Sequence, residues 1–401
     1  MPFYMKVRLF LLLPAFLLWV TVLTAQNRQI AFVEKPWADI MALAAKEKKV
    51  IFLDAYTSWC GPCKWMAANM FTNDTIADLY NSSFICAHFD MEKGEGIQLA
   101  RDYPCRAYPT LLFISPEGEV LHIRVGAPQK VRDYVEMAGI ALSPGESFSG
   151  YVKRYQDGHR DAAFMVRYLS RLQGAYLPVN EPLEAYFGSV PDQDLISRDN
   201  WLLLYLYVND IDSREFNYLL GHRKEFSERY TADSVNSKIY NVFLQALTSF
   251  GRNRPFDDSV YAQNKRKIRE SGFPEADQII FTGDLNLYQV QGETAKFTAL
   301  ALEGTDHFFG DDYQMLNRVA WHFLQVTTDK SSLEKAMGWA QRSVKLKSTP
   351  ENNNTCANLA WKLGKKEEAV KYATAAVEKA REDKTSTQVY EETLKRFTAG
   401  P

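Results

Sequence analysis

One short segment, Trp59-Cys60-Gly61-Pro62-Cys63-Lys64, limits the possible folds of this chain more than any other feature of its sequence. Residues 50–56, just before it, are apolar at nearly every position, which is typical of a central strand covered on both faces. Residues 60–70 have the pattern of a helix. The two cysteines therefore lie where a buried strand passes into a helix, which indicates a domain that layers helices on a sheet.

The position of the two cysteines favours reactive sulfur chemistry. If the helix begins at Cys60, the Cys60 sulfur lies near unpaired backbone N–H groups and the positive end of the helix dipole, and both favour thiolate over thiol. Cys63 follows three residues later on the same helical face, so it can close a disulfide with Cys60. Gly61 adds no bulk beside the attacking sulfur, and Pro62 leaves no N–H unsatisfied in the first turn. The pair can therefore alternate between dithiol and disulfide.

The segments around this motif alternate between helix and strand patterns. The sequence predicts helices at 37–49, 60–70, 73–80 and 97–103, and strands at 50–56, 84–89, 110–115 and 120–125. This alternation, which closes with a hairpin, indicates a small α/β domain that ends near Leu142.

The first 25 residues have the pattern of a secretory signal peptide. Lys6 and Arg8 precede the apolar stretch 9–23, and Thr24-Ala25-Gln26 supplies a cleavage site. The alternative is a membrane anchor, but the stretch is shorter than the roughly 20 residues that a spanning helix needs. We therefore expect export to the periplasm or cell envelope, with no stable membrane insertion after cleavage. In that oxidising compartment a cysteine pair persists as a disulfide unless something supplies electrons.

Residues 143–147 interrupt the pattern, and from Tyr151 onward the apolar residues keep a helical period. The pattern predicts helices at 161–173, 200–209, 213–229 and 234–250. Two later segments are similar, because Ala320-Trp321 and Ala360-Trp361 each lie in a first helix that a second helix follows. This pattern resembles tetratricopeptide repeats, although two copies are fewer than the three that such arrays usually need. We expect a helical domain at 143–310 and tetratricopeptide-like repeats at 311–401.

Several segments resemble the thioredoxin family in order and spacing. Besides the cysteine motif, they are Asp54-Ala55-Tyr56, Tyr108-Pro109-Thr110, Gly118-Glu119-Val120 and Val125-Gly126-Ala127. The resemblance covers residues 33–140 and is similar to secreted thioredoxin-like proteins, among them the C-terminal domain of the membrane thiol:disulfide interchange protein. It implies an α/β thioredoxin-like domain at 26–142, a central mixed sheet flanked by helices, followed by an all-α helical-repeat region.

The resemblance also implies a role for each site residue. Cys60 would attack a substrate disulfide, Cys63 would resolve the mixed disulfide, and Asp54 would be a buried carboxylate that helps to deprotonate Cys63. The alternative for Asp54 is a strand-end aspartate facing water, but an unpaired buried charge in an apolar strand is otherwise hard to justify. The expected substrate contacts are Trp59, Gly61, Pro62, Tyr108 and Pro109, with Pro109 in the cis form.

Some residues depart from the family pattern. Tyr108 stands where many thioredoxins have a branched aliphatic residue, which makes the substrate groove more polar or more occluded. His88 replaces a lysine near Asp54 and is either a structural histidine or a group that tunes the carboxylate. Cys86 and Cys105 are additional, and we expect buried, inert thiols there rather than a second disulfide or a metal site. Cys356 is expected in a core.

These features predict an exported thiol:disulfide oxidoreductase, a reductant or isomerase that acts on protein substrates with disulfides or thiols. No cofactor or metal is expected, because the two sulfurs carry the electrons. Such a reductant needs a membrane electron donor to recharge it. The formal net charge of −2 leaves no basic excess for nucleic acid. The alternative function is a helical-repeat adaptor whose thioredoxin domain is a recognition module.

Overall fold

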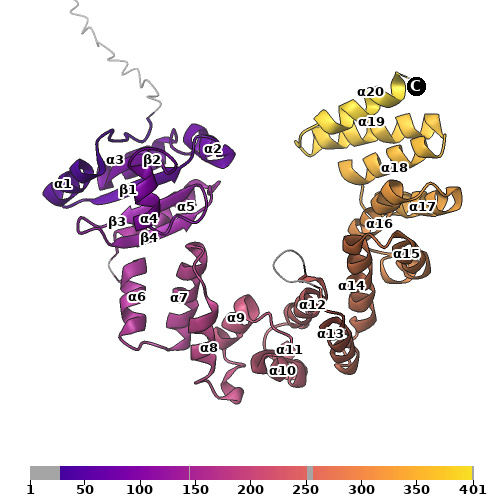
Figure 1. The fold of residues 1–401 in the computed structure, drawn as a ribbon, viewed down its shortest axis with the longest axis horizontal. Coiled ribbons are helices and arrows are strands. Elements are labelled where there is room, and N and C mark those ends of the chain that lie inside the picture. The colour runs from indigo at the N-terminus through magenta and orange to yellow at the C-terminus, as the bar shows by residue number, and fades with distance from the viewer. Residues whose placement is uncertain (1–27, 144, 251–255, 400–401) are drawn as a thin grey trace, which may run out of the picture. The chain divides into compact units, whose positions relative to one another are not determined.

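The computed structural model describes residues 28–143, 145–250 and 256–399. The predicted signal peptide, residues 1–25, lies outside the described residues. The chain divides into two compact units, one ending at Ser189 and the other beginning at Val190. Figure 1 shows the helices and strands of both units.

A four-stranded mixed sheet forms the centre of the first unit, with the order β2–β1–β3–β4. Its strands are β1 (Val50–Tyr56), β2 (Phe84–Asp90), β3 (Thr110–Ile114) and β4 (Val120–Val125). β1 runs parallel to β2 and antiparallel to β3, which continues into β4 as a hairpin. The mixed sheet agrees with the prediction. The nearly continuous apolar run of β1 reflects its central place, since residues 51–55 are all buried.

Helices cover both faces of this sheet. On one face, α1 (Trp37–Glu47) and α4 (Gly96–Asp102) pack on a core that includes Ile51 and Leu53. On the other face, α2 (Gly61–Asn69), α3 (Asp74–Ser83) and α5 (Val131–Ala141) pack on a core that includes Phe52 and Phe113. Alternate residues of β1 thus serve opposite cores, as the two-residue period of a strand requires.

The N-terminal end of the described chain lies along the outer side of β2. The Ile30 N–H donates to the Phe71 carbonyl over 2.8 Å, and the Val33 N–H donates to the Cys86 carbonyl over 2.8 Å. The Asn81 side chain accepts from the Ala31 N–H at 2.8 Å. Residues 30–33 are therefore fastened to the sheet.

Three further helices complete the first unit: α6 (Phe148–Gln156), α7 (Ala162–Gly174) and α8 (Asn180–Phe187). α6 and α7 lie against β4. Phe148, Ala175 and Leu177 join the core on the α1 face of the sheet. The compact unit thus continues past Leu142, where the α/β pattern ends, because these helices bury apolar side chains against the sheet.

Every regular element of the described part of the second unit is helical. In chain order they are η1 (Asp192–Asp194), α9 (Arg198–Tyr207), α10 (Arg214–Gly221), α11 (Arg223–Arg229), α12 (Ala232–Thr248), α13 (Asp258–Glu270), α14 (Ala276–Gln291), α15 (Thr294–Phe308), α16 (Tyr313–Val326), α17 (Lys330–Leu346), α18 (Pro350–Lys362), α19 (Lys366–Glu382) and α20 (Gln388–Thr398). The predicted single helix at 213–229 is two helices, because the backbone breaks at His222 with φ −113° and ψ 22°.

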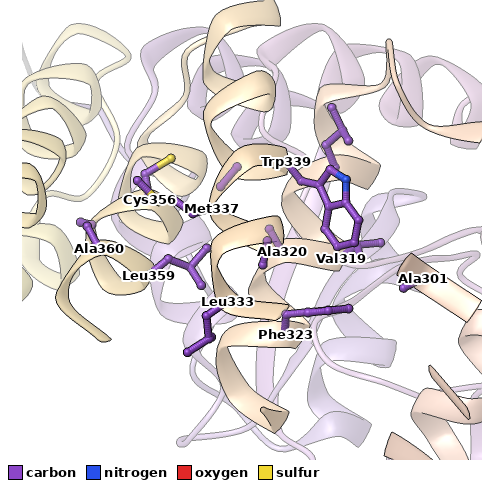
Figure 2. Close-up of a cluster of buried hydrophobic side chains, with 14 of the residues drawn as sticks. Ala301, Val319, Ala320, Phe323, Leu333, Met337, Trp339, Cys356, Leu359 and Ala360 are labelled. Atoms are coloured by element: carbon purple, nitrogen blue, oxygen red, sulfur yellow. The ribbon is translucent and has the colours of Figure 1, made fainter. Parts of the chain in front are cut away.

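The later helices share one hydrophobic core (Figure 2). It is built from small and large side chains together, with Ala320, Ala360 and Cys356 fully buried beside Trp339. The small residues let the paired helices α16–α17 and α18–α19 pack closely. Gly364 joins α18 to α19 with a φ of +77°. The helical region is as predicted, whereas its tetratricopeptide character stays a prediction.

No helix in the described ranges is both long enough and apolar enough to cross a membrane.

Candidate active site

Cys60 and Cys63 form a disulfide at the start of α2. Their sulfur atoms are 2.05 Å apart and their Cα atoms 5.3 Å apart. Cys60 is the N-cap residue of α2, and its sulfur accepts a hydrogen bond from the Cys63 N–H over 3.1 Å. Both cysteines are at least 95% buried, whereas Trp59, Gly61 and Pro62 around them are exposed. The reactive sulfurs therefore lie just under a surface formed by the three neighbours expected to contact substrate.

The backbone at this point suits a thiolate. The first turn of α2 directs its unpaired N–H groups and the positive end of the helix dipole towards Cys60. When the disulfide is reduced, these groups stabilise a negative charge on the Cys60 sulfur more than they stabilise the neutral thiol. Pro62 fits in the first turn because that position needs no N–H donor.

Asp54 lies in the middle of the sheet, beside His88 of β2 and Leu111 of β3. Its side chain is buried, and its Oδ1 atom has no hydrogen-bond partner among the described residues. Burial raises the pKa of Asp54 from 3.8 to about 7, because the carboxylate loses its hydration. A carboxyl group with this pKa can take up or release a proton near neutral pH. The strand-end position facing water, the alternative reading of Asp54, is wrong.

Trp59 and Tyr108 bring two distant loops together. Their ring centroids are 6.5 Å apart and the rings are nearly perpendicular, at 80°. The Tyr108–Pro109 peptide bond is cis, as the resemblance implied. The Pro109 carbonyl accepts from the Gly126 N–H over 2.8 Å, which ties this loop to the end of β4. The loop before β3 thus lies beside the residue that precedes Cys60.

Sequence reasoning missed the residues that follow β2. The Trp59 Nε1–H donates to Glu92 Oε2 over 2.8 Å. Lys93 Nζ lies 3.0 Å from Asp90 Oδ2 and donates to Ser58 Oγ over 3.1 Å. The order of the strands could have indicated these residues. β1 and β2 are parallel, so the residues that follow each strand meet at the same edge of the sheet.

His88 packs as an aromatic ring. It stacks on Phe32 with the centroids 4.6 Å apart and the planes 6° apart, and it lies 5.7 Å from the ring of Tyr56. Burial lowers the pKa of His88, and the nearby Glu34 opposes that shift. The neutral imidazole is therefore favoured, which agrees with the structural reading of this histidine.

The other three cysteines are free thiols, and Cys86 and Cys356 are buried as expected, whereas Cys105 is only half-buried. Burial raises the pKa of Cys86 to about 12, of Cys105 to about 11 and of Cys356 to about 12. Such thiols are poor nucleophiles at neutral pH because little thiolate forms. In the described part of the chain, no group of three or more His, Cys, Asp or Glu side chains is placed to hold a metal ion.

Comparison with known proteins agrees with this geometry. Residues 33–116 match the thioredoxin-like family. The first unit of this chain thus contains a thioredoxin-like domain, and a helical region follows that domain.

The relatives it matches include several thioredoxins. Thioredoxin-1 of Drosophila melanogaster is 36% identical over 72 residues, which are 18% of this chain and 63% of that protein. Thioredoxin H3 of Arabidopsis thaliana is 29% identical over 94 residues, 23% of this chain and 74% of that protein. The solution structure of a proposed disulphide-isomerase from Bacteroides thetaiotaomicron has 39% identity and covers 30% of this chain and 98% of its own, with a TM-score of 0.28. The chain thus spans less than two thirds of Thioredoxin-1.

Proposed function

We propose that this protein is a thiol:disulfide oxidoreductase that acts through Cys60 and Cys63. The observation that carries the proposal is the bonded cysteine pair at the N-terminus of α2, beneath the exposed Trp59, Gly61 and Pro62. The thiolate of reduced Cys60 attacks one sulfur of a substrate disulfide, and the other substrate sulfur leaves as a thiolate. Cys63 then attacks the Cys60 sulfur of the mixed disulfide. Two electrons pass to the substrate, which leaves as a dithiol, while the protein regains its disulfide.

Asp54 supports the second step in this proposal. Cys63 must lose its proton before it can attack, and a buried carboxylate with a raised pKa is a suitable acceptor near neutral pH. Protein disulfides or thiols are the proposed substrates, because the exposed residues around the pair offer an open surface rather than a small closed pocket.

We further propose that the protein works outside the cytoplasm, in the periplasm or cell envelope, as a reductant or isomerase. Residues 1–25 have the pattern of a signal peptide, and the Gly-Pro pair between the cysteines resembles the reducing members of the family. A reductant in an oxidising compartment must be recharged, so a membrane electron donor is part of the proposal.

Equilibration of the Cys60/Cys63 pair with glutathione tests the direction of electron flow. Reduction potentials range from about −270 mV for thioredoxin to about −120 mV for a strong periplasmic oxidant, a span of roughly 7 kcal/mol. We expect a value near the thioredoxin end. A reduction potential near about −120 mV, the value of the strong oxidant, would overturn the proposed direction.

Insulin reduction tests the activity itself. The wild-type protein should reduce insulin with a chemical donor, and Cys60→Ser should abolish turnover because the attacking sulfur is lost. Cys63→Ser should accumulate mixed disulfides through Cys60, since the resolving thiol is missing. Cys356→Ser is the matched control, because this cysteine lies in the core of the second unit and should leave turnover unchanged.

A second candidate function is a helical binding adaptor. The observation that favours it is the size of the second unit, which runs from Val190 to the end of the chain and has a core of its own. An adaptor would still capture its partner when Cys60 is serine, whereas an exchange enzyme would lose its covalent complexes.

A further inference from the structure

The loop after β2 is fastened to the loop that carries Cys60. The Met91 N–H donates to the Tyr56 carbonyl over 2.8 Å, and Glu92 accepts from the Trp59 indole over 2.8 Å. These two contacts are independent of each other, one between backbones and one between side chains. Glu92 is thus held in place beside Trp59, the residue next to the attacking sulfur.

One carboxylate in this loop is left without a cation. The Asp90 side chain is mostly buried and lies 3.0 Å from Lys93 Nζ, so these two charges offset each other. Glu92 is exposed, its backbone N–H donates to Asp90 Oδ1 over 3.1 Å, and within the described ranges its carboxylate accepts only from the neutral indole of Trp59. A hydrogen bond from an uncharged donor leaves the negative charge of Glu92 in place. The rim of the site beside Trp59 is therefore negative.

Two aromatic rings adjoin that charge. Trp59 is 65% exposed, and Tyr108 stands nearly perpendicular to it at 6.5 Å. Burial raises the pKa of Tyr108, and the charges of Cys105, Glu92 and Asp90 add to the rise, so Tyr108 keeps its proton at neutral pH. A positively charged side chain is attracted both by aromatic faces and by a carboxylate. A cation on a substrate would meet all three groups at this corner.

We propose that Glu92, with Trp59 and Tyr108, makes the exchange site select substrate segments that carry a lysine or arginine next to the disulfide cysteine. This inference rests on the proposed function and names its substrate class. Glu92 is here a specificity-determining residue, since it contacts substrate away from the sulfurs and does not take part in the exchange.

The expected effect is moderate, because Glu92 and Trp59 are in contact with water. An exposed ion pair and an exposed cation–π contact together give about a fivefold preference. The preference should shrink as salt is added, because exposed charges are screened.

Single-turnover reduction of matched peptides tests the inference. The protein is first reduced with dithiothreitol and freed of it, then mixed with peptides closed by one disulfide. The peptides are identical except for arginine, glutamine or glutamate beside one cysteine, and mass spectrometry follows loss of the peptide disulfide. The measured quantity is the ratio of the rate constants for the arginine and glutamate peptides. A change in the folded fraction or in the reduction potential of the cysteine pair alters both rate constants by the same factor, so it leaves their ratio unchanged.

Glu92→Gln is the decisive variant, because a glutamine oxygen can still accept from the Trp59 indole while the charge is lost. Glu117→Gln is the matched control, since Glu117 is exposed in the turn at the far end of β3 from Pro109. We expect a ratio of about five for wild type and Glu117→Gln, and a ratio of about two for Glu92→Gln, because the charge is lost while the faces of Trp59 and Tyr108 remain.

Other results would overturn the inference. An equal rate for all three peptides with wild type, or an unchanged ratio in Glu92→Gln, excludes charge selection by this corner while leaving the exchange activity intact. If the folded wild-type protein reduces none of the peptides, the proposed function fails together with the inference.

Discussion

At the scale of single residues, the proposed thiol–disulfide exchange depends on where the backbone places three side chains. Cys60 caps a helix, Cys63 lies one turn further, and Asp54 is buried in the strand that precedes them. The resemblance to thioredoxins allowed these three positions to be predicted from the sequence. Glu92 was not predicted, because its contact with Trp59 follows only when 50–56 and 84–89 are taken as neighbouring parallel strands, and the local pattern around Glu92 does not indicate that contact.

Asp54 should make the stability of the folded protein depend on pH. Its pKa is about 7 in the folded state and near 3.8 in the unfolded state, so folding takes up a proton between these values. Stability therefore falls as the pH rises from about 4 to about 7, by up to about 4 kcal/mol, and then levels off. Asp54→Asn should remove this loss, so the variant gains stability relative to wild type at pH 8 but not at pH 4. Urea unfolding of the oxidised proteins at both pH values measures the difference, and parallel pH curves would contradict it.

The three free thiols, of which Cys86 and Cys356 are buried and Cys105 is half-buried, should react slowly with alkylating agents in the oxidised protein. Cys86, Cys105 and Cys356 all have raised pKa values, so iodoacetamide at neutral pH should leave them unmodified. After reduction, Cys60 should be labelled first. Mass spectrometry of digested protein checks both statements, and labelling of Cys105 as early as Cys60 would contradict the raised pKa of this half-buried thiol.

At the scale of elements, the α/β part was predictable and the helices that follow it were less so. The bounds of β1 and β4 agree with the predicted ranges, because buried strands leave dense apolar runs bounded by turn residues. α6 and α8 were not predicted, since short helices with mixed faces give a weak periodic signal. The break at His222 was missed because helical spacing continues across it, and only the backbone angles show the interruption.

The packing of α6 and α7 on β4 predicts that they stabilise the thioredoxin-like domain. A fragment ending at Leu142 would expose core side chains that Phe148, Ala175 and Leu177 cover in the longer unit. We expect a fragment ending at Ser189 to be more stable by about 2–4 kcal/mol, from the apolar area that these residues bury. Urea denaturation, monitored by circular dichroism, compares the free energies of unfolding of the two fragments. Equal midpoints and slopes would mean that α6 and α7 contribute nothing to the domain.

At the scale of the whole molecule, the chain has two units with separate hydrophobic cores. The disulfide belongs to the first unit alone. Calorimetry should therefore show two unfolding transitions, and reduction of the Cys60–Cys63 bond should shift only one of them. A fragment from Val190 onward should reproduce the transition that does not move. A single transition that shifts as a whole upon reduction would show that the two cores unfold together.

Residues 30–33 have a consequence for the behaviour of the protein at high concentration. A bare outer strand offers a row of free backbone donors and acceptors, on which another chain can add a strand and begin an aggregate. Here the Val33 N–H donates to the Cys86 carbonyl of β2, while the N–H groups of Ile30 and Ala31 donate to Phe71 and Asn81, so residues 30–33 cover part of this edge. Deletion of residues 30–33 would thus be expected to promote association between molecules before it affects thiol–disulfide exchange.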